Sequence, residues 1–147
     1  MTEASGRGPS RPIPQPFWLT EPFWEATRQH RLAIQRCALC GFYNHPPLPQ
    51  CPSCGRTDFH WDQVSGRGTI YGYTILHEPL VVGFDEVIPY NCVAVELDEQ
   101  PGLLVAANLV GEQPNVQSIG KPVEVVFESI AGGFVLPQFR LVEPANG

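Results

Sequence analysis

The stretch CALCG at residues 37–41 and the stretch CPSCG at residues 51–55 place two Cys-x-x-Cys-Gly motifs ten residues apart. In each motif two thiolates three positions apart can bind one ion, and the glycine that follows lets the backbone turn tightly. Four sulfur ligands around one centre suit the tetrahedral preference of Zn²⁺. We therefore predict a zinc ribbon whose metal ligands are Cys37, Cys40, Cys51 and Cys54.

Other uses of these four cysteines fit the sequence less well. Disulfides need an oxidising compartment, and residues 1–16 lack the apolar stretch of a secretory signal. A thioredoxin-like redox pair would need one Cys-x-x-Cys beside a βαβ pattern, not two in tandem. A rubredoxin-type iron site uses the same ligands, so the spacing alone leaves iron open beside a structural zinc. Because four thiolates fill the coordination sphere, we expect the metal to stabilise the fold and not to bind substrate.

Composition sets the broad class of the chain. Its 147 residues suffice for one ordinary domain or two very small ones, and 16 prolines with 14 glycines favour short strands over long helices. The sequence contains no apolar run of 18 residues, so no transmembrane helix is predicted. With no secretory signal either, we expect a cytoplasmic protein. Residues 1–16 have little apolar content and are predicted to be a disordered tail.

Residues 17–36 are predicted to form an N-terminal helix and a short strand. Thr20 can cap a helix that reaches about Arg31, Pro22 is tolerated in the first turn, and residues 32–36 alternate as a strand. Two interpretations of the aromatic residues here stay open. They pack on the protein's own barrel, or they form a partner surface, because a short helix needs a docking site and aromatic clusters are enriched at interfaces. The candidate interface residues are Phe17, Trp18, Phe23 and Trp24.

The zinc ribbon is predicted to span residues 37–65. Between its two cysteine motifs, residues 42–50 include three prolines and are expected to form a rigid extended loop. Since the four cysteines already fill the metal site, we expect His45 on the surface or next to the ligands. After the second motif, residues 59–64 alternate and are expected to close the ribbon against the following domain.

Residues 66–147 show a β pattern and are predicted to form a barrel. The expected strands are residues 67–77, 90–97, 103–110, 121–130 and 134–142. Pro137 confines the last strand to an edge or a bulge. Five antiparallel strands in about 75 residues suit an OB-fold, and a sandwich fragment or an SH3-like barrel would fit nearly as well. The predicted fold is therefore mainly β, with an N-terminal helix, a rubredoxin-like zinc ribbon and a C-terminal five-stranded OB-fold barrel.

Charge argues against the main alternative function, that of a single-stranded nucleic-acid-binding OB-fold protein. OB-folds and zinc ribbons both serve that purpose, and such proteins need a positive groove because phosphates dominate affinity. Residues 1–65 carry six basic and five acidic side chains, whereas residues 66–147 carry three basic and ten acidic ones, a net charge of −7. We therefore predict no nucleic-acid partner.

Catalytic motifs are missing from the sequence. It contains no glycine-rich phosphate loop, no Gly-x-Ser-x-Gly and no His-Glu-x-x-His. Cys92 falls in a predicted strand without a base nearby and is expected to act as a small buried hydrophobe. His77, at a strand end, is interpreted as part of the barrel rim. An enzyme that uses Cys92 or His77 is a third hypothesis, and no catalytic residue is predicted for the chain alone.

The order of several short motifs resembles a known family. These motifs are TEPFW at 20–24, LAIQRCALCG at 32–41, GRGTIYGYT at 66–74, PYNCVAVELDE at 89–99, IGKPVEV at 119–125 and PQF at 137–139. On these motifs the sequence is similar, over about residues 17–143, to the zinc-ribbon plus OB-fold family long labelled a domain of unknown function and now regarded as acyl-CoA-associated.

The resemblance implies a non-catalytic accessory subunit. Members of this family are similar to partners of thiolase-fold enzymes, such as sterol-carrier-type thiolases and aldolases, in steroid side-chain and aromatic or fatty acid CoA-ester breakdown. The expected partners are thus a thiolase-fold or aldolase subunit and acyl-CoA, in a two-plus-two hetero-oligomer. The family offers no sharp CoA motif to match here. With a single lysine in the chain and an acidic barrel, the CoA phosphates are expected to meet arginines of residues 1–65 or of the partner.

Overall fold

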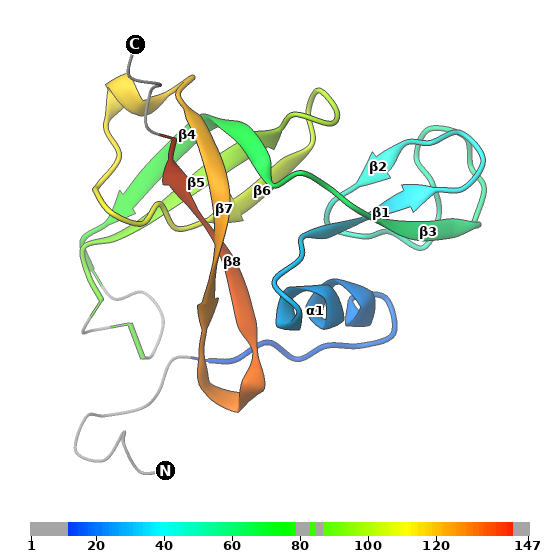
Figure 1. The fold of residues 1–147 in the computed structure, drawn as a ribbon, viewed down its shortest axis with the longest axis horizontal. Helices are drawn as coiled ribbons and strands as arrows, with labels where there is room; N and C mark the ends of the chain where they lie inside the picture. Colours follow the sequence, from blue (N-terminus) through cyan, green and yellow to red (C-terminus); the bar gives the residue numbers. More distant parts are fainter. Residues whose placement is uncertain (1–11, 79–82, 85–86, 143–147) are drawn as a thin grey trace.

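The computed structural model describes residues 12–78, 83–84 and 87–142. One α-helix, α1, lies between a small sheet and a larger curled sheet (Figure 1). The small sheet is formed by β1 (Ala33–Cys37), β2 (Tyr43–Asn44) and β3 (Phe59–Gln63). The larger sheet is formed by β4 (Arg67–Leu76), β5 (Tyr90–Leu97), β6 (Leu104–Ala107), β7 (Pro122–Ser129) and β8 (Val135–Leu141). Two 3₁₀ turns, η1 (Val116–Ser118) and η2 (Ala131–Gly133), flank β7.

The small sheet has the order β2-β1-β3, with both pairs antiparallel. Strand β2 was not predicted, because residues 42–50 were expected to be loop throughout. The buried side chain of Gln35 explains the difference. Its carbonyl oxygen accepts from Asn44 Nδ2 and from the Leu48 backbone N–H, both at 3.0 Å, and its amide donates to the Leu48 carbonyl at 2.9 Å. One side chain of β1 thus holds the loop against the sheet.

The larger sheet has the order β6-β5-β4-β7-β8, and every pair in it is antiparallel. A parallel bridge between Leu109 and Phe139 closes it, with Phe139 N–H donating to the Asn108 carbonyl and Val110 N–H to the Phe139 carbonyl. A five-stranded, partly open barrel of this kind is an OB-fold. The predicted fold class is confirmed, and the sandwich and SH3-like alternatives are not adopted. Pro137 lies in β8, an edge strand of the sheet order, where a missing N–H is tolerated.

Helix α1 (Glu21–Arg28) is shorter than predicted. Thr20 occupies the N-cap position but makes no side-chain cap, which corrects the sequence-based expectation. Its hydroxyl instead accepts from the Phe17 N–H at 3.1 Å and lies 3.3 Å from the Phe17 carbonyl. The helix stops before Arg31 because His30 adopts a positive φ of 59° and turns the chain. No helix in the described ranges has both the length and the apolar character that a membrane span requires.

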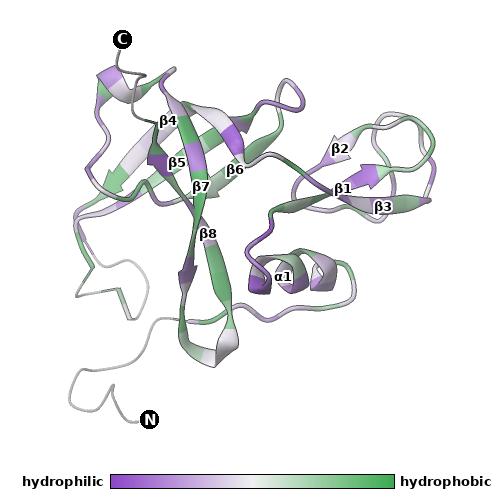
Figure 2. Ribbon diagram, viewed as in Figure 1, coloured by the Kyte–Doolittle hydropathy of each residue, from purple (hydrophilic) through white to green (hydrophobic). Residues whose placement is uncertain are grey.

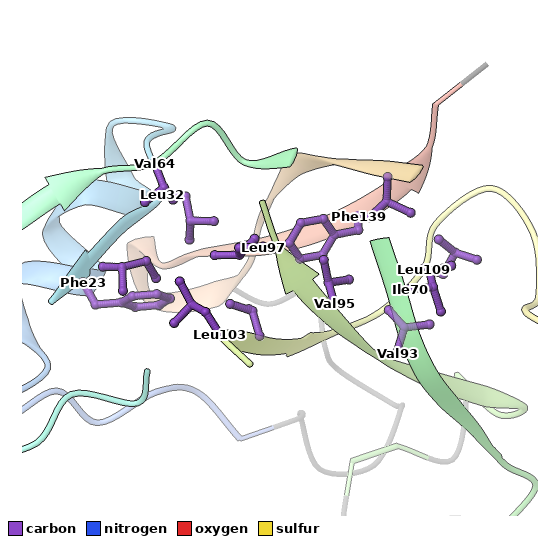
Figure 3. Packing of buried hydrophobic residues seen from close by; sticks show 13 residues of the cluster. Phe23, Leu32, Val64, Ile70, Val93, Val95, Leu97, Leu103, Leu109 and Phe139 are labelled. Atoms are coloured by element: carbon purple, nitrogen blue, oxygen red, sulfur yellow. The ribbon is translucent and has the colours of Figure 1, made fainter. Parts of the chain in front are cut away.

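The hydrophobic core is shared between the ribbon and the barrel. Fully buried residues alternate with half-buried ones along the second half of β5, so one face of this strand points into the barrel. Figure 2 shows hydrophobic residues along the strands of the larger sheet. Figure 3 shows Phe23, Leu32 and Val64 next to Leu97 and Leu103, and the cluster then continues into the barrel. Burial of one continuous cluster therefore joins the helix, the small sheet and the barrel into one packed unit.

Candidate metal centre and partner surface

The four predicted metal ligands lie together at one end of the ribbon. Their sulfur atoms all lie within 4.8 Å of one another, with Cys37 Sγ 3.6 Å from Cys54 Sγ and Cys40 Sγ 3.7 Å from Cys51 Sγ. A tetrahedral centre with Zn–S bonds of about 2.3 Å requires S···S distances of about 3.8 Å. The separations between the two motifs therefore fit a four-thiolate zinc site.

The local backbone explains why the sulfurs converge. Gly41 and Gly55 follow the second cysteine of each motif with φ of 80° and 79°, a conformation that a side chain would disfavour. Each glycine N–H bonds back to the carbonyl of the first cysteine in its motif, at 3.0 and 2.8 Å. The second half of each motif thus folds over its first cysteine.

Hydrogen bonds to sulfur prepare the site for a cation. The backbone N–H groups of Cys40 and Leu39 both lie 3.4 Å from Cys37 Sγ, and these bonds, the Cys40 N–H foremost, lower the pKa of the Cys37 thiol to about 6. The pKa of Cys54 is raised to about 11: the Arg56 N–H lowers it, but burial and the three neighbouring thiols outweigh that effect. Four thiolates this close cannot all ionise without a positive ion among them, as like charges disfavour one another.

The structure separates the four aromatic residues of the candidate interface. Phe23 is only 7% exposed and belongs to the shared core, and the half-buried Trp24 packs edge-on against Phe134 with ring centroids 5.9 Å apart. Phe17 and Trp18 are 52% and 73% exposed. Phe23 and Trp24 thus pack on the protein's own fold. The exposed rings of Phe17 and Trp18 remain available to a partner.

His45 is more buried than expected. Its ring lies 5.4 Å from the Phe23 ring, and burial lowers its pKa to about 4. Its buried Nδ1 makes no hydrogen bond to any described residue. The prediction of a surface position for this histidine is wrong, because the proline-containing loop folds toward α1 and buries the ring.

A cavity of about 420 Å³ lies next to His45 and was not foreseen from the sequence. Its wall includes Trp24 of α1, Cys92 of β5 and Gln138 of β8. Residues so far apart in the chain carry no local signal of a shared pocket. His77 is exposed at the end of β4 and is not among the described residues of that wall, so the structure does not bring it together with Cys92.

Two family models match consecutive parts of the chain. Residues 24–60 match the model described as "ChsH2, rubredoxin-like zinc ribbon domain", and residues 61–128 match "ChsH2, C-terminal OB-fold domain". The first range contains all four cysteines of the cluster. The predicted structural zinc is thereby confirmed as the cofactor, and the assignment of these four cysteines as its ligands stays a prediction.

Curated relatives include subunits of larger assemblies. The chain is 41% identical over 83% of its length to the "Probable enoyl-CoA hydratase alpha subunit" of Thermomonospora curvata, and 33% identical over 71% to the "3-oxo-4,17-pregnadiene-20-carboxyl-CoA hydratase alpha subunit" of Mycobacterium tuberculosis. It spans about a third of each, 37% and 32% respectively. It is also 34% identical over 65% of its length to a "DUF35 domain-containing scaffold protein" of Methanocaldococcus jannaschii, of which it covers 66%.

A solved structure extends the similarity to the whole fold. A chain of the structure titled "Ltp2-ChsH2(DUF35) aldolase" superposes with a TM-score of 0.77 at 37% identity. The match covers 88% of this chain and 98% of that chain.

Proposed function

Because the chain belongs to the ChsH2 (DUF35) family of zinc-ribbon plus OB-fold proteins, we propose that it is a non-catalytic accessory subunit of a carbon–carbon bond-cleaving enzyme. It binds a thiolase-fold enzyme, either a sterol-carrier-type thiolase or a retro-aldolase, and helps to hold that enzyme's acyl-CoA substrate. The observation that carries this proposal is the match to nearly the full length of a chain in an aldolase structure. The absence of catalytic motifs from the sequence supports an accessory role.

The substrate class in the proposal is a CoA ester from steroid side-chain, aromatic acid or fatty acid breakdown. Two relatives are named for hydratases of CoA esters, one of them with a pregnadiene skeleton. We take the CoA-ester context from these names and not the hydration, because the chain matches only about a third of each relative.

The partner surface in the proposal is the turn that precedes α1. The Phe17 carbonyl accepts from the N–H groups of Thr20 and Glu21 at 2.8 and 2.9 Å, and the Thr20 hydroxyl binds the Phe17 N–H. These bonds fix the turn that carries the exposed rings of Phe17 and Trp18. A fixed turn loses little conformational entropy on binding, and exposed aromatic anchors are frequent hot spots of interfaces.

Contacts to the CoA phosphates are assigned to arginines of residues 1–65 or of the partner. Three arginines are already in ion pairs: Arg28 with Glu25, Arg36 with Asp62 and Arg140 with Glu124. The barrel region is acidic overall. The triply phosphorylated head group is therefore expected to meet other arginines of residues 1–65 or cations of the partner.

The test is reconstitution with the captured partner. The tagged chain is used to capture proteins from its native cytoplasm, a thiolase-fold protein of roughly 40 kDa is identified by mass spectrometry, and the purified pair is examined by sizing with light scattering. Loss of a central aromatic anchor typically costs about 2 kcal/mol, so Trp18→Ala is expected to weaken the complex about 30-fold. Val116→Ala, at a side chain 70% exposed on η1, is the matched control and should leave affinity unchanged.

Each outcome of this experiment bears on the proposal. A two-plus-two mass and faster acyl-CoA turnover by the pair than by the partner alone support it. Elution of the chain alone, or with nucleic acid detected by absorbance, contradicts it. Equal affinity of the Trp18→Ala variant and the wild type would move the interface elsewhere.

A further inference from the structure

The cavity of about 420 Å³ lies along the seam where the barrel closes. Strands β6 and β8 form its two sides, Phe23 and Trp24 of α1 cover it, and the loop of residues 45–47 completes the wall. Helix, ribbon and barrel thus all contribute, and a volume of this size falls within the roughly 300–1,000 Å³ range of small-molecule pockets.

The seam stays open here for a structural reason. The chain after β6 is bridged to β8 at Leu109 and Phe139, and the described hydrogen bonds across the seam lie close to this bridge. Two positions before Phe139, Pro137 has no N–H with which to pair across the gap, and it lines the cavity. Ala106 and Ala107 of β6, both small residues, also line the cavity. Missing backbone pairing and small side chains together leave the space.

The polar groups of the wall are mostly occupied within the protein. Gln138 accepts from the Asn108 N–H at 2.6 Å, and its amide donates to the Asn108 side chain at 3.0 Å and to Glu128 at 2.8 Å. The Asn108 amide in turn donates to the Asn91 carbonyl at 2.5 Å. These uncharged amides are held in place by hydrogen bonds within the protein, so they do not require a ligand to supply hydrogen-bond partners.

Charge defines the class of ligand. The described residues of the cavity wall include no aspartate, glutamate, lysine or arginine. Its titratable base, His45, is neutral at pH 7, and the remaining wall is dominated by aromatic, proline and aliphatic side chains. A charged group would lose its hydration here without gaining a counter-ion, whereas an apolar body replaces loosely held water.

We propose that this cavity binds an uncharged, largely apolar molecule, or the uncharged apolar part of a larger one. The same chemistry is available from a free hydrophobic ketone or from the acyl end of a CoA thioester. If the ligand is the acyl end of a CoA thioester, the inference rests on the proposed function, whereas binding of a free ketone does not depend on it. In neither case does the cavity hold the phosphorylated head group of CoA.

Cys92 provides a direct reporter of occupancy. It is half-buried and lines the cavity, and the other four cysteines belong to the metal cluster. The zinc-loaded full chain is treated with N-ethylmaleimide, and alkylation of Cys92 is followed by peptide mass spectrometry. The added compounds are progesterone, decan-2-one, decanoyl-CoA, CoA and decanoate. Binding of each is measured independently by equilibrium dialysis.

We expect progesterone and decan-2-one to slow alkylation of Cys92 at least tenfold at saturation, and decanoyl-CoA to protect where CoA and decanoate do not. Protection by the ketones identifies a free apolar ligand, and protection by decanoyl-CoA beyond that by CoA identifies an acyl group; either supports the inference. Equal protection by CoA or decanoate overturns the assignment of an uncharged ligand. Absence of both protection and binding for every compound overturns the site.

Variants locate the binding. Ala106→Trp fills the cavity and is expected to reduce affinity at least tenfold, whereas Val116→Trp adds the same ring on exposed η1 and leaves affinity unchanged. Unchanged affinity in a folded Ala106→Trp variant would place the ligand elsewhere. If that variant does not fold, the wild-type protection data still decide. Complex formation with the partner is scored separately, so the cavity and the proposed function can fail independently.

Discussion

Replacing Phe23 with alanine separates the two roles that aromatic residues near α1 can have. The ring is 7% exposed, belongs to the core shared by ribbon and barrel, and lies 5.0 Å from the Trp24 ring and 5.4 Å from the His45 ring. Removing a buried phenylalanine side chain costs about 3–5 kcal/mol, because apolar contact is lost and a void remains. We therefore expect Phe23→Ala to destabilise the isolated protein strongly.

The expected shift in melting temperature follows from chain size. With about 2.1 cal/mol/K of unfolding entropy per residue, 147 residues give roughly 0.3 kcal/mol/K. A loss of 3–5 kcal/mol then lowers Tm by about 10–17 °C. Circular dichroism melts of the zinc-loaded protein, with urea unfolding as a second measure, test this value.

Trp18→Ala is the matched comparison. Trp18 is 73% exposed, and substitutions at such surface positions change stability by about 0.5 kcal/mol or less. We expect its Tm to stay within about 2 °C of the wild type while partner binding weakens. A Phe23→Ala protein that melts within about 3 °C of the wild type would refute the assignment of this ring to the core.

Three further perturbations test other parts of the structure. Removing the metal with a chelator should unfold the ribbon, because a structural zinc contributes roughly 10–16 kcal/mol of apparent binding energy. Intrinsic tryptophan fluorescence, to which Trp61 of β3 contributes, and metal content report this unfolding, and an unchanged melt would contradict a structural role. Gly68→Ala places a Cβ against the Glu96 carbonyl and should lower the free energy of unfolding by about 1–3 kcal/mol or more. Gly72→Ala lies on the same strand with open space around it, so its stability in urea unfolding should match the wild type. Because burial lowers the pKa of His45 from 6.5 to about 4, stability is lost as pH falls from about 6.5 to 4, by about 3 kcal/mol. The free energy of unfolding of the His45→Phe variant should fall less than that of the wild type between pH 7 and 4.5. Equal decreases in the two proteins would exclude the histidine as the cause.

The sequence predicted what is encoded locally. Cysteine spacing identifies the metal site because the two motifs and the glycines behind them determine the backbone turns by themselves. Alternation located the barrel strands closely, for example β5 at residues 90–97. Strand β6 is shorter than the predicted 103–110, since the chain after Ala107 leaves β5 and bridges to β8 instead.

Features that depend on long-range packing were not accessible in the same way. The four aromatics near α1 look equivalent in sequence, and only the docking of α1 against β1 and β8 divides them into buried and exposed pairs. The burial of His45 depends on the Gln35 side chain, which holds the loop at Leu48 and draws it toward the sheet. The cavity requires residues from the helix, the loop and three barrel strands at once.

The shared core gives the metal centre an influence beyond the ribbon. Strands β1 and β3 connect the cysteine cluster to the core. At their ends away from the cysteines, Leu32, Ile34 and Val64 belong to the same buried cluster as Leu97 and Leu103 of the barrel. Helix α1 lies over this junction and carries both the exposed aromatic turn and one wall of the cavity. A barrel without the folded ribbon would lose the support of the loop at residues 45–47 and of α1. By stabilising the ribbon, the zinc would therefore also stabilise the aromatic turn before α1, which a partner would contact, and the cavity wall, which a ligand would contact.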